Sequence, residues 1–174
     1  DDSGSRHYLG NETRSQNAAI LEDTVLYIRR SGGSISKIAA MKNAVGNFID
    51  QVTANATGDP ATNEDDVTHR LGIVKFSGNE SDQIGNDTYR SDGNTYNYSQ
   101  VVQDLTSVTG NVQSLKNTVN ELAAAGSTRT DFGLNQAQRV LDGDRQHGLG
   151  GAREEAKQVV VVFTDGEPST FSNW

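Results

Sequence analysis

Four consecutive valines and a phenylalanine at residues 159–163 constrain the fold of this chain more than any other feature. A strand that is apolar at every position has no polar face for water, so this segment predicts a central strand that is buried on both faces, as in parallel sheets. Residues 71–76 predict a second, largely buried strand. Such strands need neighbours in a sheet and helices above and below. The sequence therefore predicts an α/β layered fold.

Three segments have the apolar periodicity of amphipathic helices: about residues 36–55, 111–125 and 131–141. On one face of the first helix, apolar residues recur at the 3.6-residue period: Met41, Val45, Phe48, Ile49 and Val52. Asn111 and Thr130 are the expected N-caps of the second and third helices, and Gly126 is the expected C-terminal glycine of the second.

Two polar regions interrupt this pattern. Residues 7–36 predict a long inserted loop with one strand or hairpin around the apolar stretch 24–28. Residues 77–100 are rich in Asn, Asp, Ser, Gly and Tyr, and they predict a polar loop region with a short edge strand near residues 95–98. Both regions suit surface positions between the buried elements.

The length and charge of the chain limit its class. Its 174 residues suit one compact domain. The formal net charge of −8 argues against nucleic acid or an anionic membrane surface as a partner, because both need basic patches, and it is compatible with cation binding. No apolar run reaches the length of a membrane span. The absence of cysteine excludes disulfides, thiolate metal sites and a cysteine nucleophile.

Three short motifs carry oxygen donors that suit a cation. They are Asp1-x-Ser3-x-Ser5, the loop around Thr128 at a predicted helix entrance, and Thr164-Asp165-Gly166 after the valine strand. Ligands of open α/β sheets lie outside the carboxyl ends of the strands, so loops there can bring these groups to one point. Hydroxyl and carboxylate oxygens are hard ligands that suit Mg²⁺. The motifs predict one metal site.

The motifs resemble those of von Willebrand factor type A domains, also called integrin I-like domains. The resemblance covers residues 1–174 in order, from motif to helix, strand, helix, threonine loop, helix, strand and final motif. Residues 42–50 and 72–77 are especially similar to the A domains of Gram-positive surface and pilus-tip proteins. The resemblance implies a three-layer, Rossmann-like fold in which helices flank a mostly parallel sheet.

In that family, the matching residues form the metal-ion-dependent adhesion site. The resemblance implies that the hydroxyls of Ser3, Ser5 and Thr128 contact Mg²⁺ or Mn²⁺, with Ca²⁺ less suited. It implies that Asp1 and Asp165 act directly or through water. A sixth coordination position would stay open for an acidic side chain of a protein partner.

The sequence departs from the family pattern in several places. Arg6 stands where methionine is common, and the insertion at 7–36 is longer than usual. The family's first strand would immediately precede Asp1, between the two predicted buried strands, and further strands and a helix would follow the last motif. We therefore expect a partial A domain, an excerpt of a longer chain with other domains.

Other polar residues are weaker candidates for a site. Glu167 and Asp131 lie near the motifs in the sequence. We expect both to be surface acids, which could hydrogen-bond the metal ligands without binding the metal. Three aspartates lack EF-hand spacing and predict a solvated loop rather than a calcium site: Asp82, Asp87 and Asp92. Three histidines stand in unrelated segments and predict surface positions rather than a catalytic base: His7, His69 and His147.

The leading hypothesis is a metal-dependent adhesion module of a secreted, wall-anchored bacterial surface protein. An alternative is an intracellular A domain that binds a partner subunit in a chelatase or ATPase complex. A third hypothesis is a Mg²⁺-dependent phosphotransferase with Asp165 as nucleophile. Position 167 is Glu where that chemistry needs Asp, and the Walker and G-x-S-x-G motifs are absent, so we expect no enzyme.

Overall fold

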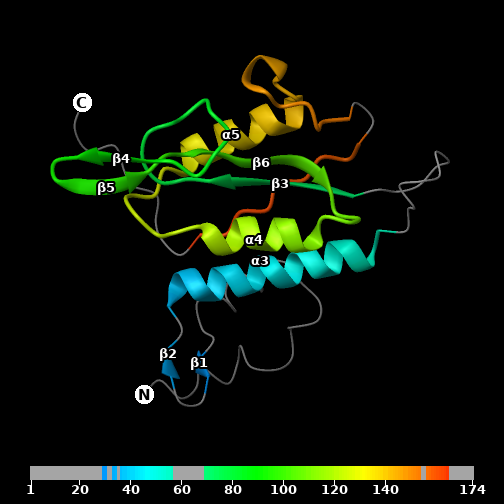
Figure 1. Ribbon diagram of the computed structural model, residues 1–174, viewed down its shortest axis with the longest axis horizontal. Helices are drawn as coiled ribbons and strands as arrows, with labels where there is room; N and C mark the ends of the chain where they lie inside the picture. Colours follow the sequence, from blue (N-terminus) through cyan, green and yellow to red (C-terminus); the bar gives the residue numbers. More distant parts are fainter. Residues whose placement is uncertain (1–28, 31–32, 35, 57–68, 154–155, 165–174) are drawn as a thin grey trace.

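The computed structural model describes residues 29–30, 33–34, 36–56, 69–153 and 156–164 (Figure 1). Its elements follow in chain order: β1 (Arg29–Arg30), β2 (Gly33–Ser34), α3 (Lys37–Ala54), β3 (Arg70–Lys75), β4 (Thr88–Ser91), β5 (Asn94–Asn97), β6 (Gln100–Ser107), α4 (Val112–Glu121), α5 (Thr130–Asp142) and the 3₁₀ helix η1 (Arg145–His147). No helix within these residues has the length and apolar character needed to cross a bilayer.

The described elements form three layers around the paired strands β3 and β6. On one face, Leu71 and Ile73 of β3 pack against a buried cluster that is supplied by α3, α4 and the end of β6: Ile49, Val108, Leu115 and Val119. On the other face, Val74 packs against a cluster that contains Val140 of α5. Successive strand residues point to opposite faces, so β3 contributes to both cores. This arrangement confirms the α/β layered fold (Figure 1).

The pairing of the strands differs from the sequence prediction in its direction. β3 and β6 run antiparallel, with Arg70 opposite Ser107 and Lys75 opposite Gln100. The ladders between the described strands are all antiparallel, so the mostly parallel pairing that we predicted is not found among them. An antiparallel edge on an otherwise parallel sheet is common in α/β folds.

The three predicted helices are confirmed, and α3 matches most closely. The Ser36 hydroxyl accepts a hydrogen bond from the Ala39 N–H at 3.3 Å, which caps this helix. One predicted cap position is confirmed and one is wrong. Asn111 is the N-cap residue of α4, but its side chain donates to the Ser107 carbonyl at 3.1 Å instead of capping the helix. Thr130 is the first residue of α5, and Arg129 precedes it as the N-cap.

The end of α4 also differs from the prediction, because tertiary contacts capture the next carbonyls. The helix ends at Glu121, so Gly126 lies in the following loop. The Asn97 side chain donates to the Ala123 carbonyl at 2.6 Å, and the Asn97 N–H donates to the Ala125 carbonyl at 3.2 Å. These carbonyls therefore bind the β5 strand and do not extend the helix.

The polar region 77–100 contains more structure than the sequence predicts. The expected edge strand near 95–98 is present as β5, which pairs with β4 in an antiparallel hairpin. β6 has no counterpart among the predicted strands. Its first residue, Gln100, is fully buried, and its side chain exchanges hydrogen bonds with Asp87 and donates to the Gln83 carbonyl. A polar side chain that is satisfied in this way hides a buried strand from an apolar pattern.

Two further predictions concern the ends of the chain. β1 and β2 form a short antiparallel hairpin inside the predicted insertion, and the apolar stretch 24–28 lies outside the described residues. The predicted buried strand at 159–163 is wrong for this structure. The segment forms no strand, and the exposed fractions of Val159, Val160 and Val161 are 66%, 46% and 46%. A strand requires a hydrogen-bonded neighbour, and no described strand pairs with this segment.

Candidate functional site

Of the five predicted metal ligands, the structure places only Thr128. Asp1, Ser3, Ser5 and Asp165 lie outside the described residues, so the ligand set stays a prediction. Arg6, His7 and Glu167 also lie outside them. Within the part of the chain that is described, no group of three or more His, Asp or Glu side chains is arranged to hold a metal ion.

The loop that carries Thr128 is fastened to the carboxyl end of β3. The Ser77 hydroxyl, just after β3, donates to the Ala125 carbonyl at 2.5 Å. The Ser127 hydroxyl donates back to the Ser77 carbonyl at 3.0 Å. These two bonds fix the residue directly before Thr128. The sequence therefore placed the threonine loop correctly at a strand's carboxyl end.

Two glycines allow this close approach. Gly126 has a φ of +107°, and a Cβ atom there would lie 2.4 Å from the Ser77 hydroxyl oxygen. Gly133, in the first turns of α5, lies against Phe76, where a Cβ atom would come within 2.8 Å of the Phe76 side chain. Larger residues would separate the loop and the start of α5 from the end of β3. The position of Thr128 therefore depends on these glycines.

Parts of two of the three predicted motifs line one large apolar groove. Thr128 and Thr164 line one groove, together with Ser77 at the end of β3. Thr164 is the residue before Asp165, so the last described residue of that motif lies with Thr128 in the same groove. The Thr128 hydroxyl, on a loop held at the end of β3, is an oxygen donor of the kind that a hard cation takes.

The Asp131 carboxylate is paired with the guanidinium group of Arg129. Arg129 donates two hydrogen bonds to the Asp131 carboxylate, at 2.8 and 3.0 Å, and its guanidinium stacks on the Phe132 ring at 3.6 Å. The hydrogen bond from Arg129 lowers the pKa of Asp131, and the same bond raises the pKa of Arg129. This arrangement agrees with the prediction of a surface acid at Asp131.

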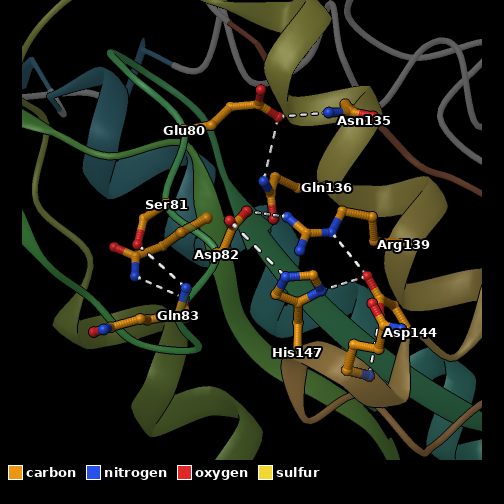
Figure 2. A network of polar contacts seen from close by, with 11 residues as sticks. Glu80, Ser81, Asp82, Gln83, Asn135, Gln136, Arg139, Asp144 and His147 are labelled. Carbon is orange, nitrogen blue, oxygen red and sulfur yellow. Dashed lines mark hydrogen bonds and ion pairs between the residues drawn. The ribbon is translucent and has the colours of Figure 1, made fainter.

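A polar network ties the loop after β3 to α5 and η1, as Figure 2 shows. Arg139 lies at its centre and contacts Asp82 at 2.6 Å and Asp144 at 3.3 Å. His147 Nδ1 lies 2.7 Å from the same Asp144 oxygen. The hydrogen bond with His147, together with that from Arg139, lowers the pKa of Asp144. Asp82 pairs with Arg139 at the surface, where the Asp82 side chain is 67% exposed.

Sequence reasoning missed this network and an aromatic cluster on the hairpin. The Tyr89 ring lies 5.5 Å from that of Tyr96 and 4.6 Å from that of Tyr98, measured between centroids. The Tyr89 hydroxyl accepts a hydrogen bond from the Asn79 N–H at 3.1 Å. A Cβ atom on Gly126 would lie 3.0 Å from the Tyr96 ring, so the cluster adjoins the Thr128 loop. Alternation of Tyr with polar residues at 95–98 was the available signal.

Comparison with known families gives one match. A family model described as von Willebrand factor type A domain matches residues 25–173. The match contains Thr128 and Asp165, and it leaves Asp1, Ser3 and Ser5 outside. Neither the curated proteins nor the solved structures gave a match.

Proposed function

Because this chain belongs to the von Willebrand factor type A family, we propose that it is a metal-dependent module that binds a protein partner. The observation that carries the proposal is the Thr128 loop, which Ser77 and Ser127 hold at the carboxyl end of β3. We propose that Asp165, which follows Thr164 in the sequence, is a second ligand of the same cation. Ser3, Ser5 and Asp1 would complete the ligand set.

In this proposal, Mg²⁺ or Mn²⁺ supplies the chemistry of attachment, because it accepts a carboxylate from the partner as a further ligand. The chain's own residues position the cation and select the partner. Thr128 offers its hydroxyl from a fixed loop. Asp131 stays bound to Arg129 and does not compete for the cation. The proposal includes no catalytic step.

The surface around this edge suits a protein partner. The cluster of Tyr89, Tyr96 and Tyr98 adjoins the Thr128 loop. Tyrosine combines a rigid apolar ring with a polar hydroxyl, and side chains of this kind are enriched at protein interfaces. We propose that this hairpin sets the shape that a partner must fit. We also propose that the module serves adhesion at a bacterial cell surface, secreted and anchored to the wall.

The test compares two threonines. Calorimetry with Mg²⁺ would measure metal affinity of the parent protein, of Thr128→Ala and of Thr118→Ala, whose hydroxyl binds the Ser114 carbonyl on α4. We expect Thr128→Ala to lose about 10- to 100-fold in affinity and Thr118→Ala to match the parent. Far-UV circular dichroism would verify that both variants are folded. Equal affinity in all three folded proteins would contradict the site, and so would absence of binding in the folded parent.

A further inference from the structure

A small polar pocket opens at the surface between α3 and α4, which lie side by side (Figure 1). We call it the α3–α4 pocket, and its volume is about 210 Å³. Sites for drug-sized ligands occupy roughly 300–1,000 Å³, so this pocket suits a group about as large as one ring. Its polar lining comes from both helices: Lys42, Asn43, Gly46 and Asn47 of α3, and Lys116 and Asn120 of α4.

Gly46 is the first observation that points to a ligand. It lies in the interior of α3, where glycine weakens a helix because it loses the most conformational freedom on folding. Packing does not require glycine here, since no atom would lie within 4 Å of a Cβ at this position. Glycine also serves where a ligand closely approaches the backbone. The absent side chain at Gly46 therefore leaves room for a bound group.

Two asparagines lie on the same face of α3 as Gly46. Asn43 and Asn47 stand three residues before it and one residue after it, a spacing that places all three side by side. Asparagine is unfavourable in a helix interior because its side chain competes for backbone hydrogen bonds. Both side chains are exposed and make no hydrogen bond with the described residues. Each carboxamide therefore offers N–H donors and an oxygen acceptor to a ligand.

A lysine gives the α3–α4 pocket a positive charge. Lys42 is partly buried, and its ammonium group donates to the Asn120 carbonyl at 2.7 Å, which leaves further N–H donors for a ligand. Lys116 already pairs with Asp50 at 2.6 Å. No carboxylate belongs to the lining of the pocket. The charge of Lys42 is therefore available to a single anionic group, although the whole chain carries a net charge of −8.

We propose that the α3–α4 pocket binds one anionic sugar residue at the end of a glycan chain. The anionic group, a carboxylate or a sulfate ester, pairs with Lys42. The ring hydroxyls, which both donate and accept, exchange hydrogen bonds with Asn43 and Asn47. Val119 also lines the pocket and supplies an apolar contact for the ring carbons. One ring fills the volume, so the remainder of the glycan lies in solvent.

Other small ligands fit this lining less well. A bare inorganic anion would leave the carboxamides of Asn43 and Asn47 without partners, and a neutral sugar would leave Lys42 without one. The proposal depends on neither a metal nor the Thr128 loop, since residues 125–130 are not part of this lining. It is therefore independent of the proposed metal-dependent function.

The test follows backbone amides by nuclear magnetic resonance while sugars are added to the chain of residues 1–174. Methyl glucuronide and a sulfated methyl glucoside supply the ring and the charge. Methyl glucoside has the ring without the charge, and sodium sulfate has the charge without the ring. We expect saturable shifts at residues 42–47 and 116–120 with both charged sugars. Methyl glucoside and sodium sulfate should each bind about tenfold more weakly.

Three variants locate the site. Gly46→Gln places a side chain in the pocket, and glutamine is a better helix former than glycine. This variant should therefore unfold at the same temperature as the parent protein or higher, yet bind the charged sugars about tenfold more weakly. Ala54→Gln adds the same side chain at the exposed end of α3, outside the pocket, and should bind like the parent. Lys42→Gln should lose about tenfold in affinity for the charged sugars alone.

Four results would overturn the proposal. One is the absence of saturable shifts with either charged sugar at millimolar concentration. Equal affinity for sodium sulfate would mean an adventitious ion only, and equal affinity for methyl glucoside would mean that the charge is not recognised. Unchanged affinity in folded Gly46→Gln would place the binding elsewhere. Metal affinity is measured separately with Thr128→Ala, so failure here leaves the Thr128 site untouched.

Discussion

The two segments that were predicted as buried strands have very different surroundings, because β3 pairs with β6 and residues 159–163 pair with no described strand. Along one edge, β6 completes a ladder, and side chains from both faces enter buried clusters with α3, α4 and α5. The large apolar groove beside β3 is lined in addition by Val159, Val160 and Val161, which stay exposed. An apolar sequence thus indicates that a segment would be more stable when buried. Whether it is buried depends on the presence of a strand that pairs with it.

Polar residues complete the paired side in a way that hydropathy does not reveal. Gln100 is fully buried in β6 because its side chain finds partners in Asp87 and Gln83. Arg139 joins Asp82 and Asp144 across the outside of α5. The paired strands therefore contain buried polar residues, whereas the valines at 159–161 are apolar and exposed. The four predictions below test that contrast.

The largest effect should come from a truncation in the paired core. Ile49 of α3 is 2% exposed, so Ile49→Ala should lower the free energy of unfolding by about 2–5 kcal/mol. Val160→Ala, on the groove side, should change it by no more than about 0.5 kcal/mol. Urea denaturation followed by circular dichroism measures both. A cost for Val160→Ala equal to that for Ile49→Ala would show that the valine segment is buried in solution.

The next effect concerns the close approach of Gly126 to the Ser77 side chain. Gly126→Ala adds a Cβ atom 2.4 Å from the Ser77 hydroxyl oxygen at a φ of +107°, and it should cost roughly 1–3 kcal/mol of unfolding free energy. Gly93→Ala is the matched control, since its φ is +79° and no atom lies within 4 Å of the added Cβ. The difference between the two denaturation midpoints isolates the steric contact. Identical midpoints would mean that the Thr128 loop is not held against β3.

A smaller effect of the opposite sign is expected on the groove side. The Thr130 hydroxyl oxygen is buried and has no hydrogen-bond partner among the described residues. Thr130→Val keeps the shape and removes the unsatisfied group, so it should be neutral or should stabilise the fold by about 1 kcal/mol. The control is Ser77→Ala, which removes the bond to the Ala125 carbonyl and should destabilise by about 1 kcal/mol. Destabilisation by Thr130→Val, measured by thermal unfolding, would show that the hydroxyl has a partner.

Helix α3 was predictable because its information is local. The apolar period from Met41 to Val52 and the cap at Ser36 lie within the segment itself. The end of α4 was not predictable, because Asn97 and Ser77 take the carbonyls of residues 123 and 125 from elsewhere in the chain. β6 was missed because satisfied polar side chains interrupt its apolar pattern. Contacts with distant parts of the chain, which no local pattern contains, decided where α4 ends and why β6 was missed.

In the candidate site too, local motifs were predictable from the sequence and long-range contacts were not. The loop that carries Thr128 was predictable from a motif at a helix entrance, and the bond from Ser127 to the Ser77 carbonyl holds this loop at the end of β3. The role of Thr128 as a metal ligand stays a prediction. The tyrosine cluster and the Arg139 network were not predictable, since Arg139 and Asp82 lie 57 positions apart. The contributions of Asp1, Ser3, Ser5 and Asp165 stay predictions.

The smallest effect should appear at acid pH in the Arg139 network. The hydrogen bond from His147, then that from Arg139, lowers the pKa of Asp144 in the folded chain. A carboxyl whose folded pKa is lowered stabilises the fold above its unfolded pKa, and this contribution is lost as the pH falls through the folded value. In Asp144→Asn, the free energy of unfolding should therefore fall slightly less steeply at acid pH than in the parent protein. Near neutral pH, its dependence on pH should be the same in both proteins. Asp92→Asn, on the exposed β4–β5 turn, is the control, and thermal unfolding between pH 2 and about 6 measures both. An acid limb that is unchanged in Asp144→Asn would show that the network contributes nothing in solution, and the contrast between the two sides would then depend on β6 and the buried clusters alone.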